Sequence, residues 1–341
     1  MAFSSVHWYA LLCFGFLGAA LVASLAAILA GERSRKGRAG SVYRSLLPSA
    51  GGDGGGGRTG EEEGADGVSG CELWLSRWRG VHPAALLAVR LAAAAAMIGV
   101  LIWDLLTYDW SIMLYYTEWT FLLVIIYFLI ASVISAHGCW MYGKCATEND
   151  EVNAFLKGDV AVDIPVTLYG TDRNKNVSKS HSYYEQGYYQ QKTGFMGYLM
   201  LIAYQTSAGA VVLTDFVFWA LLVPLLSVEH FKLDLLMGCM HTLNLVFLLL
   251  DTALNSLPFP WFRMAYFTLW SCIYVIFQWV LHACGFSWWP YPFLKLSTPW
   301  APLWYFCLAL VHIPCYGMYS LLVSSKNSIL SQIFSHAYRR P

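Results

Sequence analysis

Seven stretches of the chain are apolar over the length that a helix needs to cross a bilayer. About 20 such residues cover the roughly 30 Å hydrocarbon layer. The candidate spans are residues 8–30, 84–106, 112–137, 197–226, 231–257, 264–285 and 303–325. The pattern therefore predicts an all-α fold, a polytopic transmembrane helix bundle of about seven spans, with a six-helix core plus an N-terminal anchor helix.

Polar residues within the fifth span follow a helical repeat. In FKLDLLMGCMHTLNLVFLLLDTALNSLPF, an advance of about 100° per residue places five polar side chains within about 60° of one another, and Asp251 borders them. This predicted polar stripe consists of Asp234, His241, Asn244, Thr252 and Asn255. Polar groups inside a membrane are costly and face the bundle interior or a water-filled cavity, so we expect the stripe to point inward.

The third span opens with YYTEWTF, which brings hydroxyl groups to one end of an otherwise apolar helix. The same helical advance puts Thr117 and Thr120 on one face and Glu118 beside it. Thr117 is predicted about 7 Å deep and His241 about 15 Å deep at 1.5 Å per residue. The two side chains are therefore predicted to meet in the outer half of one cavity. Hydrogen bonding between helices is the alternative role for these polar groups.

Composition agrees with a membrane protein, because 57% of the 341 residues are hydrophobic and only 12% are charged. The net charge of zero says little, but the lysines and arginines are unevenly placed, with 18 on one side of the predicted spans and two, Lys232 and Lys295, on the other. Basic residues are retained on the cytoplasmic side, which predicts the N-terminus outside and the C-terminus in the cytosol. The remaining basic residue, Arg90, is expected to snorkel toward the cytoplasmic end of the second span.

The segments between the spans define the predicted organisation. Residues 1–30 are the transmembrane anchor, and 31–82, rich in glycine and charge around GGDGGGGRTGEEEGADG, is predicted to be a disordered cytoplasmic linker. The bundle occupies 83–326 and includes a cytoplasmic loop at 138–194, and residues 327–341 form a cytoplasmic tail. The 138–194 loop is either a partly ordered connection or a surface that packs under the bundle or binds a partner.

An aromatic motif, WWPYPF, lies between the last two spans. Tryptophan and tyrosine favour the membrane–water interface, and its closely spaced prolines disfavour a continuous helix. We expect this loop to lie across the outer mouth of the bundle, as an aromatic belt or as the lining of a lipid entrance. Its residues in that role are Trp288, Trp289 and Tyr291.

Several site chemistries find no support in the sequence. The histidines are scattered singly rather than clustered as an iron-binding site requires, so no metal is expected. A GxSxG turn, a glycine-rich phosphate loop and a basic nucleic-acid surface are absent from the sequence, and no cofactor is predicted. The expected surroundings are membrane lipids, with a lipid-like molecule as the possible substrate, no nucleic acid, and no protein partner identified.

Three segments carry a family resemblance: YYTEWTF, MHTLNLVFLLLDTAL and YVIFQWVLHACGFSWWPYPFL. They resemble the rolling-stone-like family of multipass proteins, over about residues 100–325. More distantly, the order of a threonine near a helix end, Met-His-Thr and then Trp-x-Tyr-Pro is similar to the androgen-induced family of membrane threonine hydrolases. That resemblance implies hydrolysis of fatty-acid esters of hydroxy fatty acids by a threonine–histidine pair. It matches His241 to the histidine and Thr117 to the threonine, with Thr120 one turn away.

Three functions follow as hypotheses. In an intramembrane lipid-ester hydrolase, Thr117 would attack the ester, His241 would accept the proton and Asn244 would steady the oxyanion. Asp234 would orient the imidazole through water, because seven residues of helix separate the two by roughly 10 Å. The alternatives are a non-enzymatic membrane adaptor, by analogy with rolling-stone-like proteins implicated in cell fusion, and a small-molecule or ion carrier that uses the polar stripe.

Overall fold

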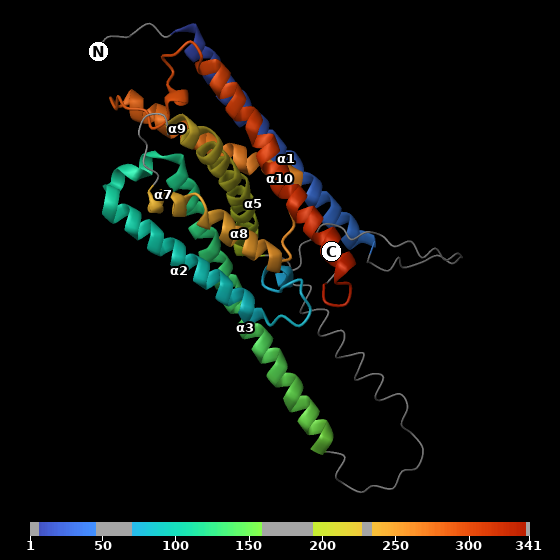
Figure 1. Cartoon of the computed structure of the whole chain (residues 1–341). Helices are drawn as coiled ribbons and strands as arrows, with labels where there is room; N and C mark the ends of the chain where they lie inside the picture. The colour runs from blue at the N-terminus through green and yellow to red at the C-terminus, as the bar shows by residue number, and fades with distance from the viewer. Residues whose placement is uncertain (1–6, 46–69, 159–193, 227–233, 339–341) are drawn as a thin grey trace, which may run out of the picture.

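A computed structural model describes residues 7–45, 70–158, 194–226 and 234–338 (Figure 1). Within these ranges the chain is built almost wholly of helices. The longer ones are α1 Trp8–Ser45, α2 Pro83–Tyr108, α3 Tyr116–Gly158, α5 Phe195–Phe216, α8 Leu243–Leu254, α9 Met264–Ala283 and α10 Ala301–Ile333. The shorter ones are η1 Gly70–Leu73, η2 Asp109–Leu114, η4 Val217–Leu222, α6 Val223–Leu226, α7 Leu235–Met240, η6 Trp261–Arg263 and η7 Pro292–Leu294.

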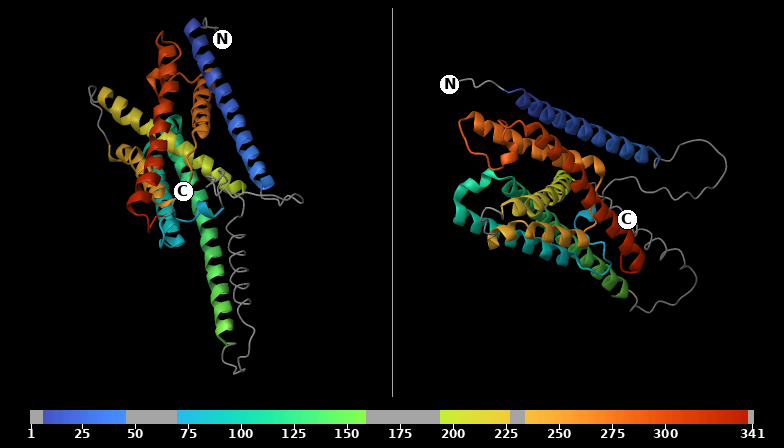
Figure 2. Two further views of the ribbon diagram at one scale, coloured as in Figure 1. Left: turned by 90° about the vertical axis from the view of Figure 1, so that its right-hand side faces the viewer. Right: turned by 45° about the horizontal axis from the view of Figure 1, so that its top comes forward.

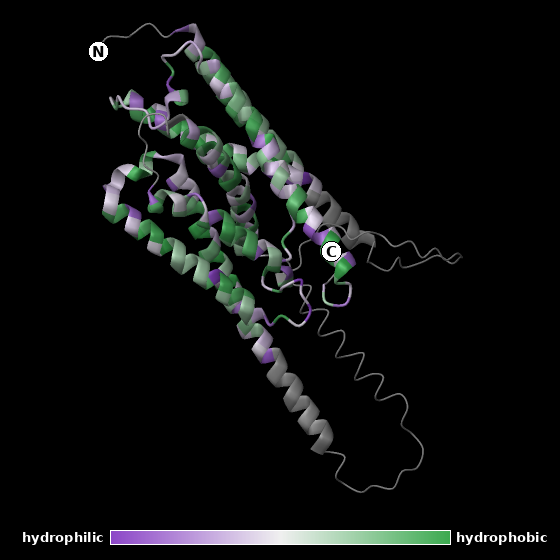
Figure 3. Ribbon diagram, viewed as in Figure 1, coloured by the Kyte–Doolittle hydropathy of each residue, from purple (hydrophilic) through white to green (hydrophobic). Residues whose placement is uncertain are grey.

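Seven helical segments in the described part of the chain are long and apolar enough to cross a membrane. They are Trp8–Ser34, Pro83–Leu114, Tyr116–Lys144, Phe195–Leu222, Leu235–Leu254, Trp261–Ala283 and Ala301–Ile333. Each overlaps one predicted span, and apolar residues follow these helices over most of their length (Figure 3). The prediction of an all-α multipass membrane protein is confirmed.

Helix α5 lies in the middle of the bundle (Figures 1 and 2). It packs against α3, α9 and α10, while α2 packs against α3 and α8. Of its spanning window 78% is buried, against 17% for α1. This burial explains why its polar residues Gln205, Thr206, Ser207 and Asp215 are tolerated, since all four are shielded from lipid by neighbouring helices. Helix α1 lies along α9 and α10, so the predicted anchor is also a packed member of the bundle.

The two ends of the bundle differ in character. At one end, called here the aromatic end, lie the starts of α1, α3 and α10 and the 284–300 connection with its tryptophans and tyrosines (Figure 1). At the other, called the basic end, lie Arg77, Arg79 and Lys326, near the end of α8. Helix α3 continues past the bundle at the basic end as far as Gly158.

Several predicted boundaries are wrong. The linker was placed at 31–82, but α1 continues to Ser45, and residues 70–82 pack against the bundle, with Leu73, Trp74 and Ser76 buried. The tail was placed at 327–341, but α10 continues to Ile333 and Tyr338 is fully buried. The 70–82 segment and the residues that follow α10 pack against each other and are joined by an isolated β-bridge between Trp78 and Tyr338. This contact explains why residues in both segments are buried. Residues 46–69 of the linker and 159–193 of the 138–194 loop lie outside the described residues.

Candidate functional site

A cavity of about 100 Å³ lies near the aromatic end, a volume comparable with cavities that hold a benzene-sized molecule. Six parts of the chain line it: α3, α5 with η4, the α7–α8 junction, α9, the 284–300 connection and α10. Its walls are mainly apolar and aromatic. The polar side chains among its lining residues are Tyr116, Thr117, Thr214, His241, Ser271, Tyr274, Tyr291 and His312.

Thr117 lines this cavity from the first turn of α3, where it is half-buried. Tyr291 lines the same cavity from the 284–300 connection, and its hydroxyl lies close to Thr117. The backbone N–H of Tyr116 donates to the Tyr291 hydroxyl at 3.2 Å. Burial raises the pKa of Tyr291 to about 12, so its phenol stays protonated at neutral pH and can act as a donor beside Thr117.

His241 lines the same cavity, and its ring is held from two sides. Nδ1 lies 3.6 Å from Oδ1 of Asp215, with both side chains buried. Phe218 stacks on the imidazole, with ring centroids 3.6 Å apart and planes 7° apart. With Nδ1 turned to a carboxylate, Nε2 is the nitrogen left for other partners. Histidine between a carboxylate and a reacting group is the arrangement of a general base.

Two backbone irregularities place these side chains. Asp215 is followed by η4, a π-helical segment over Val217–Leu222, and the fifth span breaks between α7 and α8 at His241–Thr242. The Trp219 Nε1–H donates to the His241 carbonyl at 3.2 Å, which satisfies a backbone group that the break leaves without a helical partner. Non-helical backbone at membrane depth is tolerated only where protein or a cavity surrounds it, and at the break His241 is buried and lines the cavity.

Because of this break, the prediction that the polar stripe forms one continuous helical face is wrong. Asn244, Thr252 and Asn255 are buried as expected, but Asp234 is exposed and caps α7 by accepting from the Leu235 N–H at 2.7 Å. The predicted link from Asp234 to the imidazole is therefore also wrong. Asp215 on α5 is the carboxylate beside His241.

The other supporting residues lie near the cavity without lining it. Thr120 is fully buried and accepts from the Thr214 hydroxyl at 3.4 Å, a contact between α3 and α5. Glu118 is buried within electrostatic reach of Asp104 on α2. Asn244 is buried against the Asp215 carboxylate. Asn244 is therefore not placed to steady an oxyanion in the cavity.

The aromatic motif divides in the same way. Tyr291 lines the cavity and is 8% exposed, whereas Trp288 is 48% exposed and packs edge-on against Tyr115. Trp289 stacks on His282 with ring centroids 3.5 Å apart. Neither tryptophan lines the cavity. Of the three residues predicted at a lipid entrance, the structure brings only Tyr291 to the cavity.

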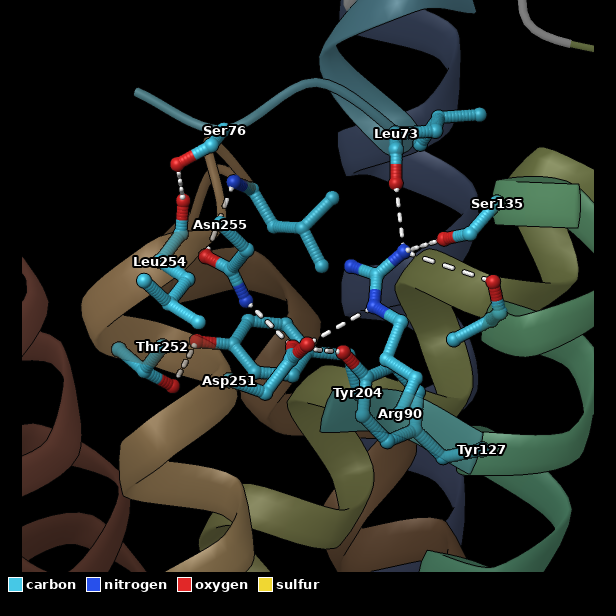
Figure 4. Close-up of polar contacts among 12 residues, drawn as sticks. Leu73, Ser76, Arg90, Tyr127, Ser135, Tyr204, Asp251, Thr252, Leu254 and Asn255 are labelled. Carbon is cyan, nitrogen blue, oxygen red and sulfur yellow. Dashed lines mark hydrogen bonds and ion pairs between the residues drawn. The ribbon is translucent and has the colours of Figure 1, made fainter. Parts of the chain in front are cut away.

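A second polar centre lies toward the basic end, where Arg90 and Asp251 form a fully buried ion pair (Figure 4). Arg90 Nε donates to Asp251 Oδ1 at 2.8 Å, and Nη1 donates to the Leu73 carbonyl at 2.9 Å and the Ser135 hydroxyl at 2.6 Å. Tyr127 donates to the other Asp251 oxygen. The expectation that Arg90 snorkels is wrong, because η1 covers this end of the bundle and supplies a carbonyl in place of water.

The neighbouring end of α8 is also fully capped. The last four carbonyls of a helix have no partner within it. Here the Asp251 carbonyl accepts from the Asn255 N–H, and the Thr252 carbonyl accepts from Lys326 Nζ. The Ala253 carbonyl accepts from Trp78 Nε1, and the Leu254 carbonyl accepts from both the Arg77 N–H and Ser76 Oγ. Segment 70–82 thus docks by satisfying backbone acceptors. These contacts make the Arg90–Asp251 centre a structural element, in which Nη2 of Arg90 alone among the guanidinium nitrogens has no hydrogen-bond partner in the described residues.

Sequence reasoning overlooked three cavity-side residues. Asp215 was noted only as a polar residue in a long span, although an intramembrane carboxylate is by itself a signal of function. Ser271 and His312 come together from α9 and α10, with Ser271 Oγ 2.8 Å from His312 Nε2. In the sequence, Ser271 is a single serine in an aromatic-rich helix and His312 is one of several isolated histidines. Nothing in the sequence therefore predicts that these two side chains pair.

Comparison with known proteins finds no matching family model, no similar curated protein and no similar solved structure. Among the described residues, no group of three or more His, Cys, Asp or Glu side chains is placed to hold a metal ion.

Proposed function

We propose that the protein is an intramembrane hydrolase of lipid esters, with fatty-acid esters of hydroxy fatty acids as the substrate class that the family resemblance suggests. The observation that carries the proposal is the shared cavity. Thr117 and His241 come from different helices yet both line it, and His241 has the Asp215 carboxylate at Nδ1. The apolar walls suit an acyl chain, and the cavity polar groups suit an ester.

The proposed reaction proceeds through an acyl-threonine. Thr117 Oγ1 attacks the ester carbonyl carbon while its proton passes to Nε2 of His241, which Asp215 orients. The ester C–O bond then breaks, and the departing alkoxide takes the proton from His241. Water hydrolyses the acyl-threonine by the same proton route. The neutral Tyr291 phenol, which lines the cavity with Thr117, is our candidate donor to the oxyanion.

The test is ester hydrolysis by purified full-length protein in detergent or liposomes. Thr117→Ala and His241→Ala each abolish turnover, and the double variant loses little more, because residues that act as a unit are not additive. Thr120→Ala is the matched control, since Thr120 lies one turn along α3 and does not line the cavity. Activity that survives His241→Ala, or a wild-type protein without turnover of branched or simple esters, rejects the proposal.

A carrier is the second candidate, and the break in the fifth span favours it. Transporters use discontinuous helices to expose backbone groups near a substrate. The buried carboxyl oxygens of Asp215, which have no hydrogen-bond partner at ordinary distance in the described residues, would be the coupling groups. The test is uptake of a small molecule into liposomes that contain the protein, driven by a proton gradient. Uptake that Asp215→Asn abolishes, in a protein that shows no ester hydrolysis, would favour the carrier over the hydrolase.

A further inference from the structure

The cavity holds a second nucleophile–base arrangement besides Thr117 and His241. Ser271 on α9 and His312 on α10 both line it, with Ser271 Oγ and His312 Nε2 2.8 Å apart. His312 is 6% exposed and Ser271 is partly buried. Serine and histidine commonly hydrogen-bond between membrane helices. Two further observations set this pair apart from such a contact.

The first observation is the tautomer of His312. Its Nδ1 lies 2.6 Å from the Leu308 carbonyl, a group that can only accept a hydrogen bond. Nδ1 of the neutral ring therefore carries the hydrogen, and Nε2 presents its lone pair to Ser271. Phe267 packs on the imidazole with ring centroids 4.4 Å apart and holds it in place. The Ser271 hydroxyl must then donate to Nε2, because Nε2 without a hydrogen can only accept and lies 2.8 Å from Ser271 Oγ.

The second observation is the contact of Ser271 with Tyr116. The Tyr116 hydroxyl lies 2.8 Å from Ser271 Oγ and also lines the cavity. Since the Ser271 proton is directed to His312, Tyr116 donates to the serine oxygen. The serine oxygen is thus fixed between a donor and a base, and its remaining lone pair is available to a molecule in the cavity.

We propose that Ser271 is an acyl-accepting nucleophile with His312 as its general base, and that Tyr116 is a positioning residue for Ser271. The ligand class, a lipid ester, rests on the proposed function. Ser271 Oγ forms a bond to the ester carbonyl carbon and its proton moves to His312 Nε2. The ester C–O bond breaks, the leaving alkoxide takes that proton, and the acyl-serine remains, since turnover to the free acid still depends on Thr117 and His241.

The test uses a fluorophosphonate that carries a long alkyl chain, with the full-length protein in detergent. Serine attack forms an O–P bond and releases fluoride, which leaves a stable adduct for peptide mapping. We expect the adduct on Ser271 and its loss in Ser271→Ala. His312→Gln keeps a side chain that can hydrogen-bond but removes the base, so we expect the labelling rate to fall by about 100-fold or more while thermal stability stays near wild type.

Two controls separate this inference from a structural role and from the Thr117 proposal. Thr268→Ala changes a hydroxyl one turn earlier on α9 that bonds to its own helix at Met264, and labelling should be unchanged. Thr120→Ala changes a hydroxyl on α3 that does not line the cavity, and it should also keep the adduct on Ser271. The absence of an adduct on Ser271 in folded protein overturns the inference and leaves the hydrolase proposal standing. An adduct on Ser271 without any ester hydrolysis rejects the hydrolase proposal alone.

Discussion

Arg90 illustrates how strongly the membrane constrains a single side chain. Its burial is complete, yet Asp251 supplies the opposite charge, and Leu73 and Ser135 supply acceptors for the guanidinium. A buried ion pair is tolerated only when such hydrogen bonds satisfy both partners. Arg263, which is 1% exposed, instead donates to a neutral side-chain oxygen, Gln205 Oε1, at 2.9 Å.

The Arg90–Asp251 pair gives a stability prediction. Removing one partner leaves the other charge buried, so Arg90→Met and Asp251→Asn should each lower the free energy of unfolding by about 3–5 kcal/mol. The double variant should lose less than either single variant, because no charge is then left unpaired. Denaturation followed in detergent measures this, with exposed Arg79→Met as the control. Additive losses in the double variant would contradict the interpretation.

Tyr291 and Trp288 give a matched prediction for the aromatic motif. Tyr291→Phe removes a hydroxyl that contacts Thr117 and the Tyr116 N–H and keeps the ring, so ester hydrolysis should fall about tenfold, as expected for a hydrogen bond worth about 1.4 kcal/mol. Trp288→Phe alters an exposed ring outside the cavity and should leave hydrolysis unchanged. Equal effects of the two changes on turnover would count against a specific role for Tyr291.

At the scale of elements, the contact between α5 and α9 depends on a missing side chain. A Cβ atom at Gly209 would lie 2.6 Å from the ring of Phe267, which is fully buried and packs on His312. Gly209→Ala should therefore shift Phe267, destabilise the protein by about 1–3 kcal/mol, and lower the reactivity of Ser271. A Cβ at Gly99 would meet nothing within 4 Å, so Gly99→Ala serves as the control in the same thermal and labelling assays.

The sequence predicted the helices better than their interruptions. Apolar length marks a span, and all seven were located because lipid demands that length. The break at His241–Thr242 has no glycine or proline to announce it. It depends on a tertiary contact, the Trp219 side chain that satisfies the His241 carbonyl. The prediction that Asp234 and His241 share one helical face is therefore wrong, and so is the prediction that Asp234 orients the imidazole.

The site was predictable only in part. Thr117 and His241 were predicted about 7 Å and 15 Å deep and were expected to meet in one cavity, and both line one cavity. Asp215, Ser271 and His312 come from other helices, and their approach depends on packing that composition and periodicity do not encode. The docking of segment 70–82 was missed for a similar reason, since its contacts are largely to backbone carbonyls at the end of α8.

At the scale of the molecule, the two polar centres occupy opposite ends of the bundle. The cavity lies near the aromatic end, where six parts of the chain converge. The Arg90–Asp251 pair and the capped end of α8 close the basic end. Under the proposed function, the end of the bundle that faces the cytosol decides the leaflet from which a lipid would reach Thr117 and Ser271.

The orientation is the last prediction, and the placement of basic residues supports it. Eighteen of the 21 lysines and arginines fall on the side of the chain that holds the C-terminus, and such residues are retained in the cytosol during insertion. We expect a glycosylation tag before Trp8, or one inserted in the 284–300 connection, to be modified. A tag after Tyr338 should stay unmodified. Removing basic residues tests whether they cause this orientation. Replacing Arg33, Arg35, Lys36 and Arg38 with glutamine should reduce glycosylation of the N-terminal tag. Modification of the C-terminal tag in the unaltered chain would reverse the orientation and place the cavity on the cytosolic side.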